Sequence, residues 1–167
     1  VVDADIADIL TWSLLESATN GATSVAGTGS SPTTFTYSPK ANWSGSDSFV
    51  VGVSDGTTTD SITINVIVTP VNDPPILAPG TSATVSMSED GKPLAWVAPE
   101  LSATDQEGEK LVWGMAVQPS HGFAEIQGTG GVPTLFEYIP EVNFAGEDSF
   151  VVSVADGNSS SLFTVNV

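Results

Sequence analysis

An internal repeat constrains this sequence more than any other feature. Shifted by 101 positions, residues 12–66 align with residues 113–167 without a gap, and 23 of the 55 positions are identical. The match is densest where residues 42–49 align with residues 143–150. A repeat of this length is too long for a solenoid unit and suits a small autonomous domain. The sequence therefore predicts two copies of one domain.

The phase of the repeat predicts the domain boundaries. We expect a first repeat over residues 1–69, a linker over 70–75 and a second repeat over 76–167. The first repeat lacks a counterpart of residues 76–101, so we expect an exposed sheet edge and a partly exposed core there. We expect this edge to be covered by another chain or by residues outside this sequence. Pro70, Pro74 and Pro75 predict a stiff, extended linker.

Strand signals dominate both repeats. Residues 48–53 and 149–154 are rich in β-branched and aromatic residues and end in Asp-Gly turns, and residues 61–68 alternate between apolar and polar. Further strands are predicted at 10–14, 23–25, 33–37, 84–87, 94–97, 111–117, 123–127, 134–138 and 162–167. Short strands separated by Gly, Pro, Asn and Asp predict an all-β fold of two tandem antiparallel β-sandwiches, the first without its N-terminal strands.

The charge balance limits the partners of this chain. The formal net charge is -17, with three lysines and no arginine. Nucleic acid binding requires basic side chains that release counterions, and an anionic membrane surface repels an acidic protein. We therefore expect no nucleic acid partner and no membrane insertion. The chain has no cysteine, which excludes disulfides and thiolate metal sites.

Three acidic groups are expected to meet at one end of the second sandwich. They are the loop at residues 105–109, the turn at Asp156 and the linker pair Asn72 and Asp73. Carboxylates that converge repel one another unless a cation lies between them. Ca²⁺ accepts carboxylate, amide and carbonyl oxygens in irregular geometry. Asp-Gly turns and Asn-Asp-Pro-Pro linkers are also ordinary turn and linker chemistry, which explains these residues without a metal.

The same segments resemble the cadherin fold family, in particular the cadherin-like tandem repeats of large bacterial surface proteins. They are Ala-Thr-Asp-Gln-Glu-Gly at 103–108, Val-Ala-Asp-Gly at 154–157 and Val-Asn-Asp-Pro-Pro at 71–75. The pattern Asn-(Phe/Trp)-x-Gly-x-Asp-Ser-Phe, at 42–49 and 143–150, is typical of the bacterial branch. The resemblance covers nearly the whole chain and implies Ig-like or cadherin-like sandwiches.

The resemblance also implies calcium at the junction between domains. The ligands carried over are Asn72, Asp73, Asp105, Glu107 and Asp156, with a weaker set at Asp3, Asp5 and Asp55. This sequence lacks the family's Asp-Arg-Glu motif and has Pro70 and Pro74 where the family places Asp and Asn. Fewer ligands imply one ion or none at each junction, with an affinity on the order of 10⁻⁴–10⁻³ M.

Other polar and aromatic residues are given structural roles. Asp47 and Asp148, in Gly-x-Asp-Ser-Phe, are expected to cap the approach to a strand. His121 aligns with Asn20 and is expected in a turn. Trp12 and Trp113 are expected in the core, and Trp96 is expected to pack there too.

These observations predict a non-catalytic module of a larger protein at a bacterial cell surface or outside the cell. It would act as a calcium-rigidified spacer or adhesion element, in contact with other repeats of the same protein, through homophilic contacts or with polysaccharides. The alternative is a carbohydrate-binding module attached to a polysaccharide-active enzyme, which requires an exposed aromatic platform. Exposure of Trp43, Trp96 and Phe123 would favour that alternative. No nucleophile elbow or catalytic constellation supports an enzyme.

Overall fold

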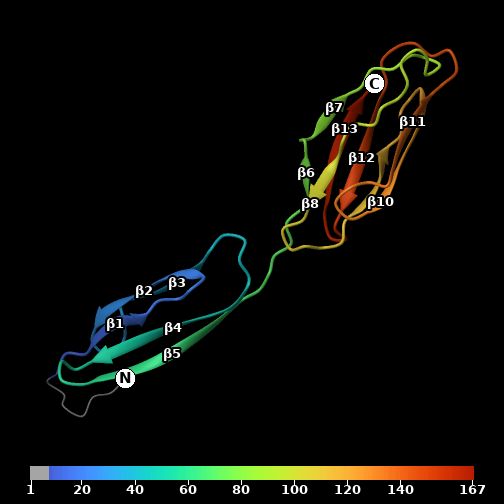
Figure 1. The fold of residues 1–167 in the computed structure, drawn as a ribbon. Coiled ribbons are helices and arrows are strands. Elements are labelled where there is room, and N and C mark those ends of the chain that lie inside the picture. Colours follow the sequence, from blue (N-terminus) through green and yellow to red (C-terminus); the bar gives the residue numbers. More distant parts are fainter. Residues whose placement is uncertain (1–7) are drawn as a thin grey trace. The chain divides into compact units, whose positions relative to one another are not determined.

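The computed structural model describes residues 8–167, which form two compact units. Unit 1 extends to Val71, and unit 2 comprises Asn72–Val167. Figure 1 shows strands and loops in both units, and no helix occurs among residues 8–167. Consequently, no described segment is a helix of the length and apolarity needed to cross a membrane.

Unit 1 is built from one five-stranded antiparallel sheet in the order β3-β2-β1-β4-β5. Its strands are β1 (Thr11–Glu16), β2 (Gly21–Thr28), β3 (Thr34–Pro39), β4 (Gly45–Ser54) and β5 (Thr59–Val68). The long β4–β5 ladder aligns Phe49 with Ile64 and Val51 with Ile62. A buried cluster of Val25, Phe49 and Val51 lies on one face of this sheet, which we call the inner face of unit 1.

Unit 2 repeats this sheet, adds one strand to it and contains a second, two-stranded sheet. The repeated strands are β9 (Val112–Val117), β10 (Gly122–Thr129), β11 (Leu135–Pro140), β12 (Ser149–Ala155) and β13 (Ser160–Asn166). The added strands are β6 (Ile76–Ala78), β7 (Ser82–Thr84) and β8 (Ser102–Thr104). The main sheet has the order β11-β10-β9-β12-β13-β7, and β6 and β8 form a separate two-stranded sheet. Figure 1 shows β7 beside β13.

The strand pattern departs from the prediction in the N-terminal part of unit 2. Residues 94–97 form no strand, because Pro93 and Pro99 lack the amide donors that a ladder needs at each end of this segment. The strand predicted at 84–87 lies earlier, at Ser82–Thr84, and it pairs in parallel with β13 rather than antiparallel. The three-residue strands β6 and β8 were not predicted, because strands this short carry no periodic signal.

Residues 76–101 cover the inner face of the unit 2 sheet, and we call them the covering segment. Leu77, Val85, Met87 and Trp96 pack against the buried cluster that includes Phe150 and the other core residues of this unit. The Trp96 ring lies 5.6 Å from the Tyr138 ring and 6.2 Å from the Phe150 ring, measured between centroids. The expected packing of Trp96 against the core is therefore present, although its backbone is irregular.

The covered sheet has the deeper core. In unit 2, Trp113 is buried at 4% exposure, and Phe163 and Val165 are fully buried. In unit 1, the equivalent Trp12 is half-buried and packs against the smaller cluster. The predicted all-β fold is confirmed, with two related sheets in tandem and N-terminal strands β6 to β8 that have no counterpart among the described residues of unit 1.

Candidate metal centre

The loop before β9 is organised around the Asp105 side chain. Its Oδ1 accepts hydrogen bonds from the backbone amides of Glu107 and Glu109, both at 3.0 Å. Its Oδ2 is buried and has no hydrogen-bond partner. A buried carboxylate oxygen without a partner is costly, because it has lost its hydration without a replacement. The hydrogen bonds of the fold therefore account for the position of Oδ1 but not for the burial of Oδ2.

The Asp156 side chain organises the turn between β12 and β13. Its Oδ1 accepts hydrogen bonds from the backbone amides of Asn158, at 2.7 Å, and Ser159, at 2.6 Å. Gly157 has a φ of 104°, which favours glycine at this position. The hydrogen bond from the Ser159 amide, followed by those from Asn158 and the Asn72 side chain, outweighs burial and lowers the pKa of Asp156. Asp156 is thus a carboxylate at neutral pH.

The first two residues of unit 2 are tied to both of these elements. The side-chain nitrogen of Asn72, Nδ2, donates to Asp156 Oδ2 at 3.1 Å and to Ser159 Oγ at 2.7 Å. The backbone amide of Asp73 donates to Glu107 Oε2 at 3.0 Å. These contacts attach the start of unit 2 to the 105–109 loop and to the 156–159 turn.

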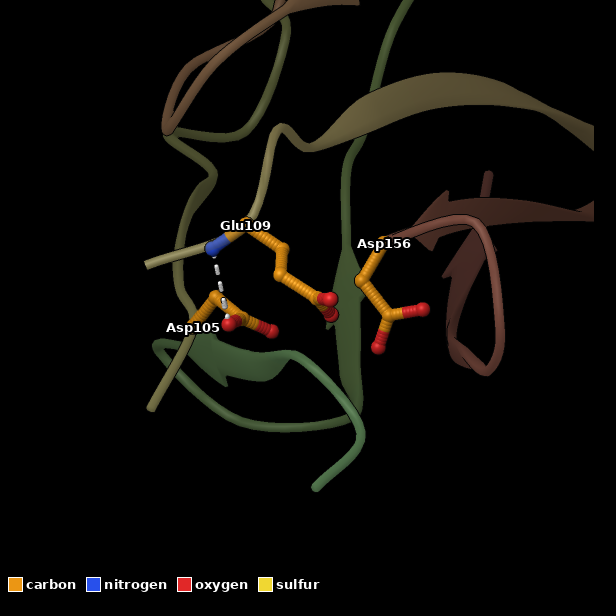
Figure 2. A group of neighbouring side chains, drawn as sticks. All are labelled: Asp105, Glu109 and Asp156. Carbon is orange, nitrogen blue, oxygen red and sulfur yellow. Dashed lines mark hydrogen bonds between the residues drawn. The ribbon is translucent and has the colours of Figure 1, made fainter. Parts of the chain in front are cut away.

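Three carboxylates converge between the loop and the turn. Asp105, Glu109 and Asp156 each contribute an oxygen, and these atoms lie within 4.8 Å of one another. Figure 2 shows the Glu109 side chain extending from the loop before β9 toward Asp156, with Asp105 beside it. Desolvation, followed by repulsion from Asp156, Asp105 and Glu107, raises the pKa of Glu109 above its ordinary value. The charge of Glu109 is therefore disfavoured by its acidic neighbours.

The donor set suits a hard divalent cation. Ca²⁺ binds carboxylate oxygens at about 2.3–2.6 Å, so two ligands on opposite sides of one ion lie up to about 5 Å apart. The separation within this group matches that span. Mg²⁺ requires a smaller, near-octahedral shell, and the absence of thiol and imidazole ligands from the group disfavours zinc.

The ligands expected from the sequence have different local roles. Asp105 and Asp156 belong to the carboxylate group, whereas Glu107 accepts a hydrogen bond from the Asp73 backbone. Asn72 is tied up with Asp156, and its Oδ1 accepts from the Asn158 side chain at 3.0 Å. Glu109 was not among the expected ligands, although its place in the alternating 105, 107, 109 pattern is a signal for it.

The weaker set expected in the first repeat is described only in part. Asp55 accepts hydrogen bonds from the backbone amides of Thr57 and Thr58 and from the Thr58 hydroxyl, which makes it a turn residue. The pKa of its carboxyl is lowered by these hydrogen bonds, first of all by that from the Thr58 amide. Asp3 and Asp5 lie outside the described residues.

Two of the three aromatic residues that would mark a sugar platform are half-buried. Trp96 is half-buried against the core of unit 2, and Trp43 is half-buried in unit 1. Phe123, on β10, is 55% exposed.

A groove of about 820 Å³ in unit 2 has His121, Phe144 and Glu89 in its lining. The His121 and Phe144 rings stack there at 4.2 Å.

Comparisons with known proteins identify the family of both repeats. A family model described as a bacterial Ig domain matches residues 1–67 and again residues 72–167. Two similar solved structures are those of the endo-fucoidan hydrolase MfFcnA4 from glycoside hydrolase family 107 and of a variant of it. Each is 20% identical over 96% of this chain, with TM-scores of 0.39 and 0.38. The chain spans 23% of the length of each. No curated protein matches.

Proposed function

Because the chain belongs to the bacterial Ig domain family, we propose that it is a non-catalytic spacer and adhesion module of a larger extracellular protein, stiffened by calcium. Bacterial Ig domains commonly occur in extracellular or surface proteins and are typically accessory modules without catalysis of their own. The tandem arrangement, the acidity and the proline-rich linker support a role in spacing and presentation.

The observation that carries the calcium proposal is the buried, unpaired Asp105 Oδ2. It belongs to a group that also includes Glu109 and Asp156, and the pKa of Glu109 is raised by desolvation and by its acidic neighbours. A bound Ca²⁺ would supply the missing partner of Asp105 and remove the repulsion between the three carboxylates. The cadherin-like character of the repeats is part of this proposal.

Calcium would act on the linker through the hydrogen bonds of its own ligands. Asp156 accepts from Asn72, and the loop that carries Asp105 accepts from Asp73 through Glu107. Asn72 and Asp73 are the first two residues after Val71, the last residue of unit 1. Fixing Asp105 and Asp156 with an ion would therefore restrict the backbone at the start of unit 2, where a hinge between repeats has to bend.

Isothermal calorimetry with CaCl₂ tests the site. The whole chain is expected to bind Ca²⁺ in unit 2 with a dissociation constant on the order of 10⁻⁴–10⁻³ M, as expected for an extracellular module with few ligands. Asp105→Asn should abolish this binding, because it removes the charge from the unpaired oxygen. Asp90→Asn removes one exposed charge outside the group and serves as the matched control.

Small-angle scattering tests the stiffening separately. The distribution of interdomain distances should narrow when Ca²⁺ is added and broaden again with chelator, in the wild type but not in Asp105→Asn. Binding by calorimetry without any change in scattering would contradict the hinge while leaving the metal site intact. Equal calorimetric binding by Asp105→Asn would contradict the site itself.

Carbohydrate binding is the second candidate, and the exposed ring of Phe123 is the observation that favours it. Its cross-strand partner Ile139 is 59% exposed, so the two form an apolar strip on β10 and β11. Sugar binding of this kind relies on aromatic stacking. Retention of the chain on an insoluble polysaccharide, lost in Phe123→Ala, would support it. Equal passage of both proteins through the column would contradict it.

A further inference from the structure

The two sheets differ in composition on the face opposite the core, which we call the outer face. In unit 2, Phe123 on β10 is paired with Ile139 on β11, and these side chains are 55% and 59% exposed. On the neighbouring strands, Val117 is paired with Val151, and Val117 is 56% exposed. Side chains of paired residues lie on the same face of a sheet. The outer face of unit 2 therefore carries apolar residues on β11, β10, β9 and β12, which are consecutive strands of the sheet.

These residues form one continuous surface, which we call the apolar band. The Gln118 side chain connects its two halves, because Nε2 donates to the Ala124 backbone oxygen at 3.1 Å and Oε1 accepts from the Ala124 amide at 3.3 Å. Gln118 follows Val117 and Ala124 follows Phe123, so these bonds hold the two band residues on adjacent strands close together. The covering segment lies on the inner face of this sheet and leaves the band exposed.

Unit 1 builds the same ladder without an apolar band. β2 and β3 pair in the same register as β10 and β11. The counterparts of the three most exposed band residues are exposed and are small or charged, namely Glu16, Ala22 and Ser38. The sheet therefore forms without large apolar side chains on this face, and the fold alone does not account for the band. Grouped exposed apolar residues of this kind mark interaction sites.

Two glutamates border the band on one side. Glu125 and Glu137 are directly opposite each other in the β10–β11 ladder, two residues along each strand from the band and so on the same face. Like charges in directly opposed positions destabilise a sheet. Unit 1 has Ser24 and Thr36 at these positions, so this repulsion is also particular to unit 2.

A third glutamate borders the band on the other side. The Glu141 amide donates to the His121 backbone oxygen at 2.9 Å, which continues the ladder beyond β10 and β11 and places both side chains on the outer face. The His121 Nδ1 lies 3.5 Å from Glu141 Oε2. This is the only ion pair among residues 8–167, so Glu125 and Glu137 have no cationic partner in that part of the chain.

We propose that the apolar band is a docking surface for a polypeptide that combines apolar and basic side chains. Its apolar side chains cover Phe123 and Ile139, and its lysines or arginines lie beside Glu125 and Glu137, where they remove the repulsion between the two carboxylates. A second copy of this chain is a poor fit, because the net charge is -17 and the same glutamates would meet one another. A neutral sugar would stack on Phe123 but would leave the glutamate pair without a counter-charge.

A synthetic peptide of alternating leucine and lysine tests this proposal in an NMR titration of the isotope-labelled whole chain. Amide signals of β9, β10 and β11 should shift as the peptide is added, and signals of the equivalent strands β1, β2 and β3 should not. A peptide with serine in place of leucine should bind at least about tenfold more weakly, because the band then has no apolar partner.

Two double variants separate the apolar and the charged contributions. Phe123→Ala with Ile139→Ser introduces the residues that unit 1 has at these positions, so the sheet should fold while the Kd rises at least about tenfold. Glu125→Gln with Glu137→Gln should also raise the Kd and should weaken its dependence on salt.

Asp90→Asn with Glu100→Gln is the matched control, because it removes two exposed charges from the covering segment and none from the outer face. Its Kd should equal that of the wild type. Unchanged binding by Phe123→Ala with Ile139→Ser would overturn the proposal, since the peptide would then be held by the net charge of the chain alone. The proposal also fails if the peptide leaves the β10 and β11 signals in place, while dimerisation or retention on an insoluble polysaccharide is lost in the same double variant.

Discussion

At the residue scale, two equivalent aspartates hold several parts of their units together, Asp47 on β4 and Asp148 just before β12. Asp148 accepts hydrogen bonds from the amides of Ser120, His121 and Ser149 and from the Tyr138 hydroxyl. Asp47 has the same set of contacts in unit 1. Burial alone would raise the pKa of Asp148, but these hydrogen bonds outweigh it and lower the pKa. The carboxylate therefore ties a loop, a strand and a buried tyrosine together.

Asp148→Asn should destabilise unit 2 by about 3 kcal/mol, because the amide cannot accept the hydrogen bonds from His121 and Tyr138 at Oδ2. A lowered folded-state pKa means that the stabilisation is complete above the unfolded-state pKa of about 4 and is lost as the pH falls through the folded-state value. Guanidinium unfolding measures this at pH 7 and below pH 4. The free energy of unfolding should fall less between these two pH values in Asp148→Asn than in the wild type.

Glu147→Gln is the matched control, because Glu147 is the exposed neighbour of Asp148 and the substitution also removes one negative charge. The dependence of its unfolding free energy on pH should equal that of the wild type. An Asp148→Asn chain that loses stability with acid as steeply as the wild type would show that other carboxylates control the acid transition.

The residues of the candidate metal centre were only partly predictable from the sequence. Asp105 and Asp156 lie in motifs whose spacing indicates convergence at one end of the sandwich. Which loop oxygens remain free depends on backbone hydrogen bonds that a sequence does not display. Asp105 Oδ1 is occupied by two amides while Oδ2 is not, and Glu107 bonds to Asp73 rather than joining the carboxylate group.

At the element scale, β5 and β13 are nearly the same strand in different surroundings. Their ladders to β4 and β12 are in the same register, yet Ile62 is exposed and Phe163 is buried. Burial of a large apolar side chain contributes roughly 1.5–3 kcal/mol. The contribution of each strand to stability is therefore set by what overlies it.

Truncating the two equivalent residues should have unequal effects. Phe163→Ala is expected to cost about 3–5 kcal/mol in unit 2, because it leaves a cavity in a packed core. Ile62→Ala should cost less than about 1 kcal/mol in unit 1. Hydrogen exchange at β12 and β4 measures each unit separately. A large loss in Ile62→Ala would indicate that this face is covered in solution.

The predictability of the strands follows from the same repeat. β4, β5, β12 and β13 combine β-branched residues, alternating polarity and Asp-Gly turns, so these strands could be predicted from the sequence. The packing of Trp96 was predicted, but the irregular backbone of the covering segment was not, because this segment meets the sheet through scattered contacts of Met87 and Trp96 rather than through a periodic face. The parallel pairing of β7 with β13 joins residues 82 positions apart, and no local pattern encodes it.

At the scale of the whole molecule, the chain carries two related units with unequal cores. The buried cluster of unit 2 includes residues of the main sheet, Ala103 on β8 and the preceding Leu101, whereas the buried cluster among the described residues of unit 1 lies on its single sheet. Apolar area removed from water is the main source of folding free energy. The two units are therefore expected to differ in stability although they share one sequence pattern.

Differential scanning calorimetry of the chain should resolve two transitions, with unit 1 unfolding at the lower temperature. Added Ca²⁺ should raise only the upper transition, because the proposed ligands all belong to unit 2. Hydrogen exchange during heating assigns each transition to its unit. One cooperative transition, shifted as a whole by calcium, would contradict both the unequal cores and the location of the ion.

The pairing of β7 with β13 sets the order in which unit 2 is completed during biosynthesis. β7 comes near the beginning of the unit and its partner comes at the very end, at Thr164–Asn166. A growing polypeptide leaves the ribosome from its N-terminus. β7 therefore cannot pair with β13 until nearly every other residue of the unit has been synthesised. Such long-range closure is slow and leaves apolar surface exposed in the meantime. Each repeat built on this plan therefore depends on its last strand for the completion of its sheet.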